Sequence, residues 1–302
     1  MILQPPSLKR GDTIGIVSTA RKIAPEELEP SVRLLEDEGF KVVFGDNLFA
    51  ADNQFAGTDK QRADDVMRFV RDSSVHAILC ARGGYGSARI LRYLSYDDIK
   101  SNPKWFCGYS DVTVMHALYQ YLGMASLHSA MPINFPKDAL ANESTRSLVD
   151  TLLGSPSVAN AAPNSLNIFG EAKGRLVGGN LSLIYSLIGT PLQVVPEGSI
   201  LFIEDLDEYL YHMDRTMLSL RQCGLLSRFS GIAVGYLNDM NDNAVPFGKT
   251  AEEIVYEHTY DLGIPVAFGI PAGHLEPNYT LMLGKSYTLT CSEEGTKLQV
   301  EL

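Results

Sequence analysis

Apolar and polar residues alternate along the first half of the chain in a pattern that predicts strands followed by helices. Residues 12–18 form an apolar run typical of a buried strand, and residues 25–38 show a helical period that ends at Gly39, as expected for a helix C-terminus. The cycle continues with strands at 41–44, 76–81 and 105–108, and with helices at 59–71, at 88–94, from 111 onward and at 143–153. This alternation predicts right-handed crossovers in a mostly parallel sheet, and therefore an α/β fold.

The second half of the chain has a different pattern, in which the predicted strands are shorter. Strands are expected at 199–203, 231–235 and 265–268, and helices at 214–223 and 250–262. Residues 280–283, 286–291 and 297–302 alternate at period two and predict a terminal antiparallel piece. The stretch 154–165 (GSPSVANAAPNS) has the composition of a linker. We therefore predict an N-terminal domain over 1–154, a linker over 155–169 and a C-terminal domain over 170–302.

The most informative stretch is residues 105–116 (WFCGYSDVTVMH), in which a strand pattern breaks at Gly108 and a helical pattern resumes at Asp111. The turn between them would hold Ser110 on its crest, beside free amides of the helix N-terminus. This geometry underlies the nucleophile elbow, although Val112 stands where the G-x-S-x-G pattern requires glycine. The alternative is that Ser110 merely caps the helix.

A glycine-rich stretch, residues 82–86 (RGGYG), lies between a predicted strand and a predicted helix. It matches neither the Walker A loop nor the G-x-G-x-x-G fingerprint. Its glycines could let a substrate approach the backbone, or they could simply serve a tight turn. Because loops at the carboxyl ends of parallel strands line the ligand crevice, we expect this loop and Ser110 to face the same site.

A nucleophilic serine needs a base, and the chain contains six histidines. His274 lies in a loop rich in glycine and proline (269–278), where functional side chains are common. His116 is six residues after Ser110 on the predicted helix and should point away from the turn. His76, at a strand start, and His258, in an amphipathic helix, are expected to be structural or solvated.

The carboxylate that orients such a base should also follow a strand. Four acidic residues come directly after the apolar run at 199–203, namely Glu204, Asp205, Asp207 and Glu208. We prefer Glu204 because it is the first residue to leave the predicted strand, where the sheet fixes its direction. The alternative is a solvated acidic loop or a helix cap.

Composition excludes several classes of protein. The 302 residues include 25 Lys and Arg against 36 Asp and Glu, a net charge of −11 that disfavours binding to nucleic acids and to anionic membranes. The four cysteines show no paired spacing and no metal-ligand motif is present, so we expect free thiols in a reducing compartment and no metal or other cofactor. With no basic, apolar leader and no segment of membrane-spanning length, we predict a cytoplasmic protein.

Five motifs in order resemble the LD-carboxypeptidase family, the serine peptidases of clan S66. They are Arg-Gly-Gly-Tyr-Gly (82–86), Gly-Tyr-Ser-Asp (108–111), Gly-Arg-Leu-Val-Gly-Gly-Asn (174–180), Ile-Glu-Asp (203–205) and Gly-His (273–274). The resemblance covers almost the whole chain. It implies a flavodoxin-like N-terminal domain that bears the nucleophile and a smaller α/β C-terminal domain that supplies a glutamate and a histidine.

The resemblance also implies a role for each site residue. Ser110 is the nucleophile, His274 the general base and then acid, and Glu204 the group that orients and stabilises the imidazolium, with Glu208 in reserve. The amides of Asp111 and Gly84 are expected to form the oxyanion hole. Arg82 and Tyr85 are candidate substrate-binding residues, Arg82 for the free carboxylate.

The implied reaction is release of the terminal D-alanine from a murein tetrapeptide during cell-wall recycling, by an enzyme that is commonly a homodimer. A second hypothesis keeps the same triad but takes peptidyl or aminoacyl nucleotides, as microcin-immunity relatives do. An adenine site favours an aromatic platform, and the single tryptophan, Trp105, is poorly placed for one. A third hypothesis is a non-enzymatic two-domain binder of a small ligand.

Overall fold

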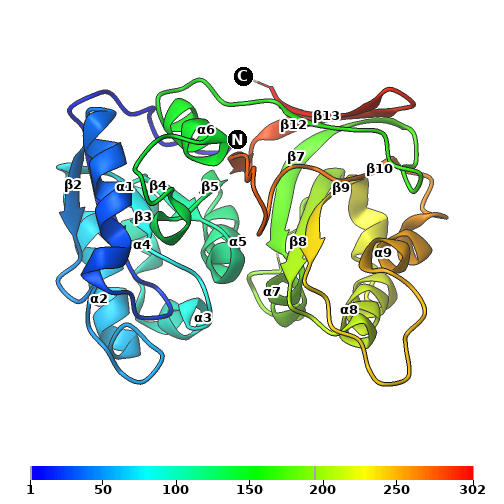
Figure 1. The fold of residues 1–302 in the computed structure, drawn as a ribbon, viewed down its shortest axis with the longest axis horizontal. Helices are drawn as coiled ribbons and strands as arrows, with labels where there is room; N and C mark the ends of the chain where they lie inside the picture. The colour runs from blue at the N-terminus through cyan, green and yellow to red at the C-terminus, as the bar shows by residue number, and fades with distance from the viewer. Residues whose placement is uncertain (1, 194, 302) are drawn as a thin grey trace. The chain divides into compact units, whose positions relative to one another are not determined.

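The computed structural model describes residues 2–193 and 195–301, and the chain divides into two compact units (Figure 1). The N-terminal unit runs to Ser157 and also includes Tyr279–Leu281, and the C-terminal unit comprises Val158–Asn278 and the chain from Met282 onward. The stretch 155–169, which has linker composition, contains strand β6 (Ala159–Ala161). Because β6 pairs with β13 (Gly295–Val300), part of this stretch belongs to the sheet of the C-terminal unit.

The N-terminal unit contains the predicted mostly parallel sheet. Its strand order is β11-β5-β4-β3-β1-β2, with β1 (Thr13–Val17), β2 (Lys41–Phe44), β3 (Val75–Cys80), β4 (Trp105–Gly108), β5 (Ser126–His128) and β11 (Leu281–Leu283). The pairs from β2 through β5 are all parallel, so the flavodoxin-like order expected for this half is confirmed. The expectation that residues 280–283 join a terminal antiparallel piece is wrong, because β11 lies at the edge of this sheet instead.

Helices cover both faces of this sheet. They are α1 (Pro25–Asp37), α2 (Asp59–Arg71), α3 (Ser87–Ile90), α4 (Tyr96–Ser101), α5 (Thr113–Tyr121) and α6 (Glu143–Leu152). Neighbouring residues of β1 face opposite sides, because a Cβ built on Gly15 would lie 2.5 Å from Phe69 of α2, whereas Ile16 packs in one cluster with Leu28 of α1. Helix α1 lies in front of the sheet in Figure 1.

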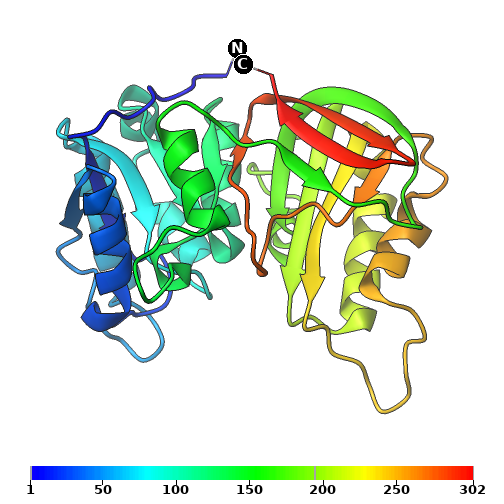
Figure 2. The same ribbon diagram turned by 45° about the horizontal axis from the view of Figure 1, so that its top comes forward.

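The C-terminal unit has a mixed sheet in the order β10-β9-β8-β7-β12-β13-β6. Its further strands are β7 (Gly170–Asn180), β8 (Ser199–Leu206), β9 (Phe229–Asn238), β10 (Val266–Phe268) and β12 (Ser286–Ser292). Strands β7 to β10 pair in parallel, whereas β12, β13 and β6 pair antiparallel (Figure 2). The antiparallel hairpin expected at the C-terminus is therefore present as β12 and β13.

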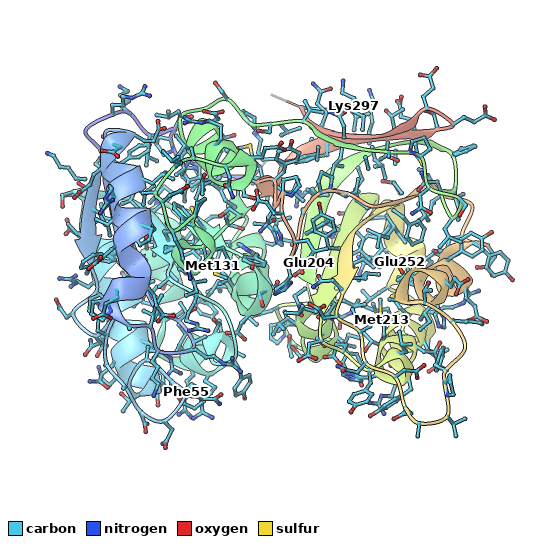
Figure 3. The ribbon with its side chains drawn as sticks, viewed as in Figure 1. Phe55, Met131, Glu204, Met213, Glu252 and Lys297 are labelled. Atoms are coloured by element: carbon cyan, nitrogen blue, oxygen red, sulfur yellow. The ribbon has the colours of Figure 1, made fainter. Side chains whose placement is uncertain are left out.

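The core of the C-terminal unit forms where two helices pack on this sheet. Helix α8 (Leu210–Gln222) contributes Met213, labelled in Figure 3, and helix α9 (Ala251–Thr259) contributes Ile254. Both side chains join a buried apolar cluster with residues of β8 and β9. The two helices thereby support the parallel strands, and the strands set the direction of side chains at their carboxyl ends.

Candidate active site

Ser110 occupies a strained turn in the N-terminal unit. Strand β4 ends at Gly108, and a 3₁₀ turn (Ser110–Val112) leads directly into α5. The φ of Ser110 is +61°, a left-handed conformation that is uncommon for a residue with a side chain and is found where structure is held for function. The residue that caps the 3₁₀ turn is Tyr109, without a side-chain hydrogen bond. Ser110 is therefore not a helix cap, and this half-buried residue lies on the turn between β4 and α5 as predicted.

The glycine-rich loop lies close to this serine. A Cβ built on Gly83 would lie 3.2 Å from Cβ and 3.3 Å from Oγ of Ser110, so no larger residue fits without a shift. The φ of the next residue, Gly84, is +113°. Close approach at Gly83 and the left-handed backbone at Gly84 both require glycine here.

The side chain of Asp111 joins the loop to the serine turn, a role that the sequence analysis did not identify. Its carboxylate is 1% exposed and accepts a hydrogen bond from the backbone N–H of Ser87 at 2.7 Å, and another from the N–H of Gly86. Burial raises the pKa of Asp111, and the hydrogen bonds from Ser87 and Gly86 partly oppose this rise. The same residue whose amide was assigned to the oxyanion hole thus also anchors the loop that carries Gly84.

His116 does not point away from the turn, so that expectation is wrong. Its Nε2 lies 2.9 Å from the carbonyl oxygen of Gly108, and its Nδ1 lies 2.9 Å from Oγ of Ser126. The reason is that α5 packs against β4 and β5, which brings a residue of the first turn of the helix to the end of β4. Burial lowers the pKa of His116 to about 4, so the ring is neutral and supports the turn from below.

The C-terminal unit brings Glu204 and His274 together, although they are 70 residues apart in sequence. Nδ1 of His274 lies 2.7 Å from Oε2 of Glu204, which is fully buried on β8 and is labelled in Figure 3. Strand β8 continues to Leu206 because it pairs with β9 as far as Asn238. Glu204 is therefore inside the strand rather than the first residue to leave it, and neither Glu204 nor Asp205 belongs to a solvated loop.

The loop that carries His274 is fixed on β8 and β9. A Cβ built on Gly273 would lie 3.1 Å from Cβ and 3.2 Å from Oε2 of Glu204, so glycine allows the loop to reach the carboxylate. The amide of Gly273 donates to Oδ1 of Asn278 at 3.0 Å, and the carbonyl of Ala272 accepts from the amide of Tyr236 at 3.0 Å. The ring is thus held with Nδ1 on Glu204, which directs Nε2 away from that carboxylate.

Charges around His274 favour its protonated form. Burial by itself lowers its pKa, but the hydrogen bond with Glu204 and the negative charges of Glu204, Asp205 and Asp239 raise the pKa above the ordinary 6.5. Glu204 and His274 thus form a histidine–carboxylate pair, an arrangement that stabilises an imidazolium.

Glu208, the reserve for the orienting carboxylate, has other partners. It hydrogen-bonds Nδ1 of His212 and Oγ of Ser182, both at 2.5 Å. Among the remaining histidines, His258 bonds Asp214 at 2.8 Å between α9 and α8, and His76 accepts from the amide of Thr13. These contacts leave Glu204 as the carboxylate that binds His274.

Asp205 is a further buried carboxylate, which the sequence shows only as one of four neighbouring acidic residues. It follows Glu204 on β8 and accepts hydrogen bonds from Nδ2 of Asn180 at 2.7 Å and from the amide of Ser182 at 2.8 Å. Burial and the neighbouring charge of Glu204 raise its pKa to about 7. The end of β7, including the Gly-Gly-Asn motif, is thereby tied to the strand that carries Glu204.

Arg82 and Tyr85, the candidate substrate-binding residues, lie on the glycine-rich loop. Arg82 is half-buried and donates from Nη1 to the carbonyl of Lys22 at 3.3 Å. Tyr85 is 51% exposed, with its ring 6.2 Å from that of Phe55. Over residues 2–193 and 195–301, no group of three or more His, Cys, Asp or Glu side chains is arranged to hold a metal ion.

A serine in a strained turn and a histidine paired with a carboxylate are side-chain features that serine hydrolases use. The sequence matches the LD-carboxypeptidase N-terminal domain over residues 14–129 and the LD-carboxypeptidase C-terminal domain over residues 173–289. These matches cover more than half of the chain, so it belongs to the LD-carboxypeptidase family, as its motifs predicted. The protein is accordingly a serine carboxypeptidase.

Named relatives agree with this assignment. The chain is 31% identical to the probable murein peptide carboxypeptidase of Bacillus subtilis strain 168 over 304 residues, which covers 98% of this chain and 94% of the relative. It is 25% identical over 295 residues to the murein tetrapeptide carboxypeptidase of Pseudomonas aeruginosa, covering 95% and 94%.

Solved structures confirm the two-domain α/β fold. The muramoyltetrapeptide carboxypeptidase from Oxalobacter formigenes superposes with a TM-score of 0.88 and 25% identity, covering 96% of this chain and 99% of that one. The microcin C7 self-immunity protein MccF, solved with aspartyl sulfamoyl adenosine, gives 0.87 with 24% identity and covers 99% of both chains, a likeness of fold alone.

Proposed function

We propose that this protein releases the terminal D-alanine from a murein tetrapeptide by cutting the bond between the L-centre of the diamino acid and D-Ala. The observation that carries this proposal is the hydrogen bond between Glu204 and His274 at 2.7 Å in a chain that also holds Ser110 in a strained turn. The names of the relatives from B. subtilis and P. aeruginosa support the choice of substrate.

In the proposed mechanism, Oγ of Ser110 attacks the scissile carbonyl while His274 takes its proton. His274 then gives this proton to the departing amine of D-Ala, and water releases the acyl-enzyme by the reverse route. Glu204 holds the ring in the correct tautomer and stabilises the imidazolium. Because the nucleophile and the base come from different units of the chain, turnover requires both units.

The amides of Gly84 and Asp111 form the oxyanion hole in this proposal. Support comes from the packing of the glycine-rich loop on Ser110 and from the anchoring of that loop by the Asp111 carboxylate. Preorganised backbone donors of this kind stabilise the negative charge that develops on the carbonyl oxygen in the transition state.

The specificity is proposed to be stereochemical. A serine attacks one face of the carbonyl, and inversion of the preceding Cα exchanges its hydrogen and side chain, which displaces the carbonyl from the oxyanion hole. A displacement of this kind costs about 10²-fold in rate. The enzyme should therefore cut the L-to-D bond of a tetrapeptide and spare the D-Ala–D-Ala bond of a pentapeptide.

Mass spectrometry of three peptides tests the proposal. The tetrapeptide should lose D-Ala, whereas the pentapeptide and the C-terminally amidated tetrapeptide should persist. Equal cleavage of all three would leave a serine hydrolase with a different substrate. Full activity in EDTA is also expected because the nucleophile is a side-chain hydroxyl, and loss of activity that zinc restores would contradict the serine mechanism.

The alternative function is cleavage of peptidyl or aminoacyl nucleotides, since the fold is also similar to that of MccF. Trp105 does not serve such a substrate as a stacking platform, because it is 1% exposed and its Nε1 donates to the carbonyl of Pro6 at 2.9 Å. An aminoacyl sulfamoyl adenosine that competes with the tetrapeptide at comparable concentration would favour this alternative.

The proposed setting is the cytoplasm, where the enzyme would act as a homodimer on recycled cell-wall peptides. Three of its four cysteines, Cys80, Cys107 and Cys291, are buried as free thiols, which suits a reducing compartment. Within the described part of the chain, no helix combines the length and apolar character that crossing a membrane requires. Light scattering of the purified protein tests the dimer.

A further inference from the structure

A basic cavity lies beside the glycine-rich loop within the N-terminal unit. Its volume is about 610 Å³, and the residues that line it include Arg21, Lys22 and Arg82, with Glu27 as its acidic member. Oε2 of Glu27 accepts a hydrogen bond from the amide of Ala24 at 2.8 Å, at the start of α1. The cavity is lined by three cationic residues and one carboxylate, and that carboxylate already accepts a backbone hydrogen bond. The excess of positive charge makes the cavity suited to an anion.

Arg21 is placed by contacts with the loop that packs on Ser110. A Cβ built on Gly84 would lie 2.6 Å from Cγ and Cδ of Arg21 and 2.8 Å from its Nε, so the arginine side chain lies across this glycine. The backbone of Arg21 forms an isolated bridge with Phe55, which is labelled in Figure 3. Adjacent glycines of one loop, Gly83 and Gly84, therefore contact the nucleophile and the arginine.

The arginines of this cavity lack the carboxylate partners that most other arginines of the unit have. Each arginine of α2 forms an ion pair within 3.0 Å: Arg62 with Asp59, Arg68 with Asp46 and Arg71 with Asp98. In the described part of the N-terminal unit, neither Arg21 nor Arg82 forms an ion pair, and Nε of Arg82 is buried without a hydrogen bond. Binding of an anion to such unpaired cationic groups is favourable, because it supplies hydrogen-bond and charge partners that they lack.

We propose that Arg21 and Arg82 form a subsite for a carboxylate of the peptide substrate. This inference rests on the proposed function, because a carboxypeptidase substrate must carry at least one carboxylate near the scissile bond. The proposal commits to a carboxylate of one of the two residues that flank the scissile bond: the terminal carboxylate of D-Ala, three bonds from the scissile carbonyl carbon, or the side-chain carboxylate of diaminopimelate, which lysine lacks. Guanidinium groups bind either in a bidentate manner.

Calorimetry with four peptides separates the two sources. They are the diaminopimelate and lysine tetrapeptides, each as the free acid and as the C-terminal amide, bound to Ser110→Ala protein so that none is consumed. Arg21→Gln in this background should weaken binding roughly 10- to 100-fold for each peptide that carries the bound carboxylate, and not for the others. A loss confined to diaminopimelate peptides identifies the side-chain carboxylate, and a loss confined to free acids identifies the terminal one.

Arg33→Gln is the matched control, because Arg33 is an exposed arginine of α1 that lines a different cavity. It should leave all four affinities unchanged, and both variants should keep the unfolding temperature of the parent. Equal affinities with and without Arg21, or the same loss on all four peptides, would overturn the subsite. Failure of the Ser110-containing enzyme to release D-Ala would overturn the proposed function separately, since these affinities do not depend on turnover.

Discussion

The two units hold their candidate site residues in different physical ways. In the N-terminal unit, Ser110 is positioned by backbone geometry: a strained turn, close glycine contacts and a short 3₁₀ turn before α5. In the C-terminal unit, Glu204 and His274 are positioned by a buried charged network, with Asp205 on the same strand. One half-site depends on shape, and the other on electrostatics.

This difference indicates where each kind of perturbation should act. A larger side chain at Gly83 would displace Ser110, because a Cβ built on Gly83 would lie 3.2 Å from Cβ of Ser110. A change of charge near His274 would instead alter proton affinity, since the raised pKa of His274 results from carboxylates around it. In the N-terminal unit, activity should therefore be sensitive to side-chain size near Ser110. In the C-terminal unit, the pH dependence of activity should be sensitive to charge near His274.

The largest effect is expected when either unit loses its reacting group. Ser110→Ala and His274→Ala should each lower kcat roughly 10⁴- to 10⁶-fold, leaving the activity that binding and the oxyanion hole provide. D-Ala release is the measurement. His76→Ala is a control because His76 is half exposed on β3, and it should stay within a few-fold of the parent. Near-parental turnover in either site variant would refute its assigned role.

Much of the N-terminal half-site could be predicted from the sequence because its determinants are local. The strand, the break at Gly108 and the following helix are adjacent in the chain, and several elements match closely, such as α2 (Asp59–Arg71) and β2 (Lys41–Phe44). The longest strand, β7 (Gly170–Asn180), was not predicted, because its glycines weaken a strand pattern and tertiary pairing with β8 and β12 compensates.

The C-terminal half-site depends on long-range pairing, which local pattern does not encode. Glu204 was selected as the first residue after a strand, yet it lies inside β8, and its partner His274 is 70 residues away. Family motifs supplied that pair, whereas the burial of Asp205 and the carboxylate contacts of Asp111 required the fold. An aspartate directly after a suspected nucleophile, before a helix, is the signal that could have pointed to such an anchor.

Next in size is the loss of the charge that stabilises the imidazolium. Glu204→Gln preserves the shape of the side chain but removes its charge, so kcat should fall by about 10⁴-fold, less than for Ser110→Ala. Glu208→Gln is a matched control on the same segment, since Glu208 contacts His212 rather than His274. A larger loss of D-Ala release in Glu208→Gln than in Glu204→Gln would reverse the assignment.

A smaller effect should follow when the glycine-rich loop is released from its anchor. Asp111→Asn removes one acceptor for the amides of Gly86 and Ser87, so stability should fall by about 1–3 kcal/mol. Misplacement of the oxyanion hole should lower kcat by roughly 10- to 100-fold. Asp65→Asn, at a buried carboxylate bonded to Asn47, should cost stability without loss of kcat. Equal kcat in the two variants would leave Asp111 a purely structural role.

The smallest expected effect is a shift in the pH profile of kcat/KM. This shift tests the electrostatic positioning of His274 and does not involve the turn that holds Ser110. Below its pKa, His274 is protonated and cannot accept the proton of Ser110, so kcat/KM should fall on the acid side with a pKa above 6.5. Asp239 is exposed, and its charge is one cause of that raised value. Asp239→Asn retains a residue that tolerates the φ of +54° while removing the charge, so the acid limb should move to lower pH.

The matched control for this shift is Asp242→Asn, an exposed aspartate nearby in sequence that is not among the groups that raise the pKa of His274. Its acid limb should coincide with that of the parent, and the plateau kcat of both variants should be unchanged, because neither side chain contacts the reacting groups. The profiles should also converge at high ionic strength, where the exposed charge of Asp239 is screened. If the acid limb moves equally in both variants, it reports the net charge of the protein rather than the charge of Asp239. If Asp239→Asn leaves the acid limb unmoved, Glu204 and Asp205 set the proton affinity of His274 without a contribution from Asp239.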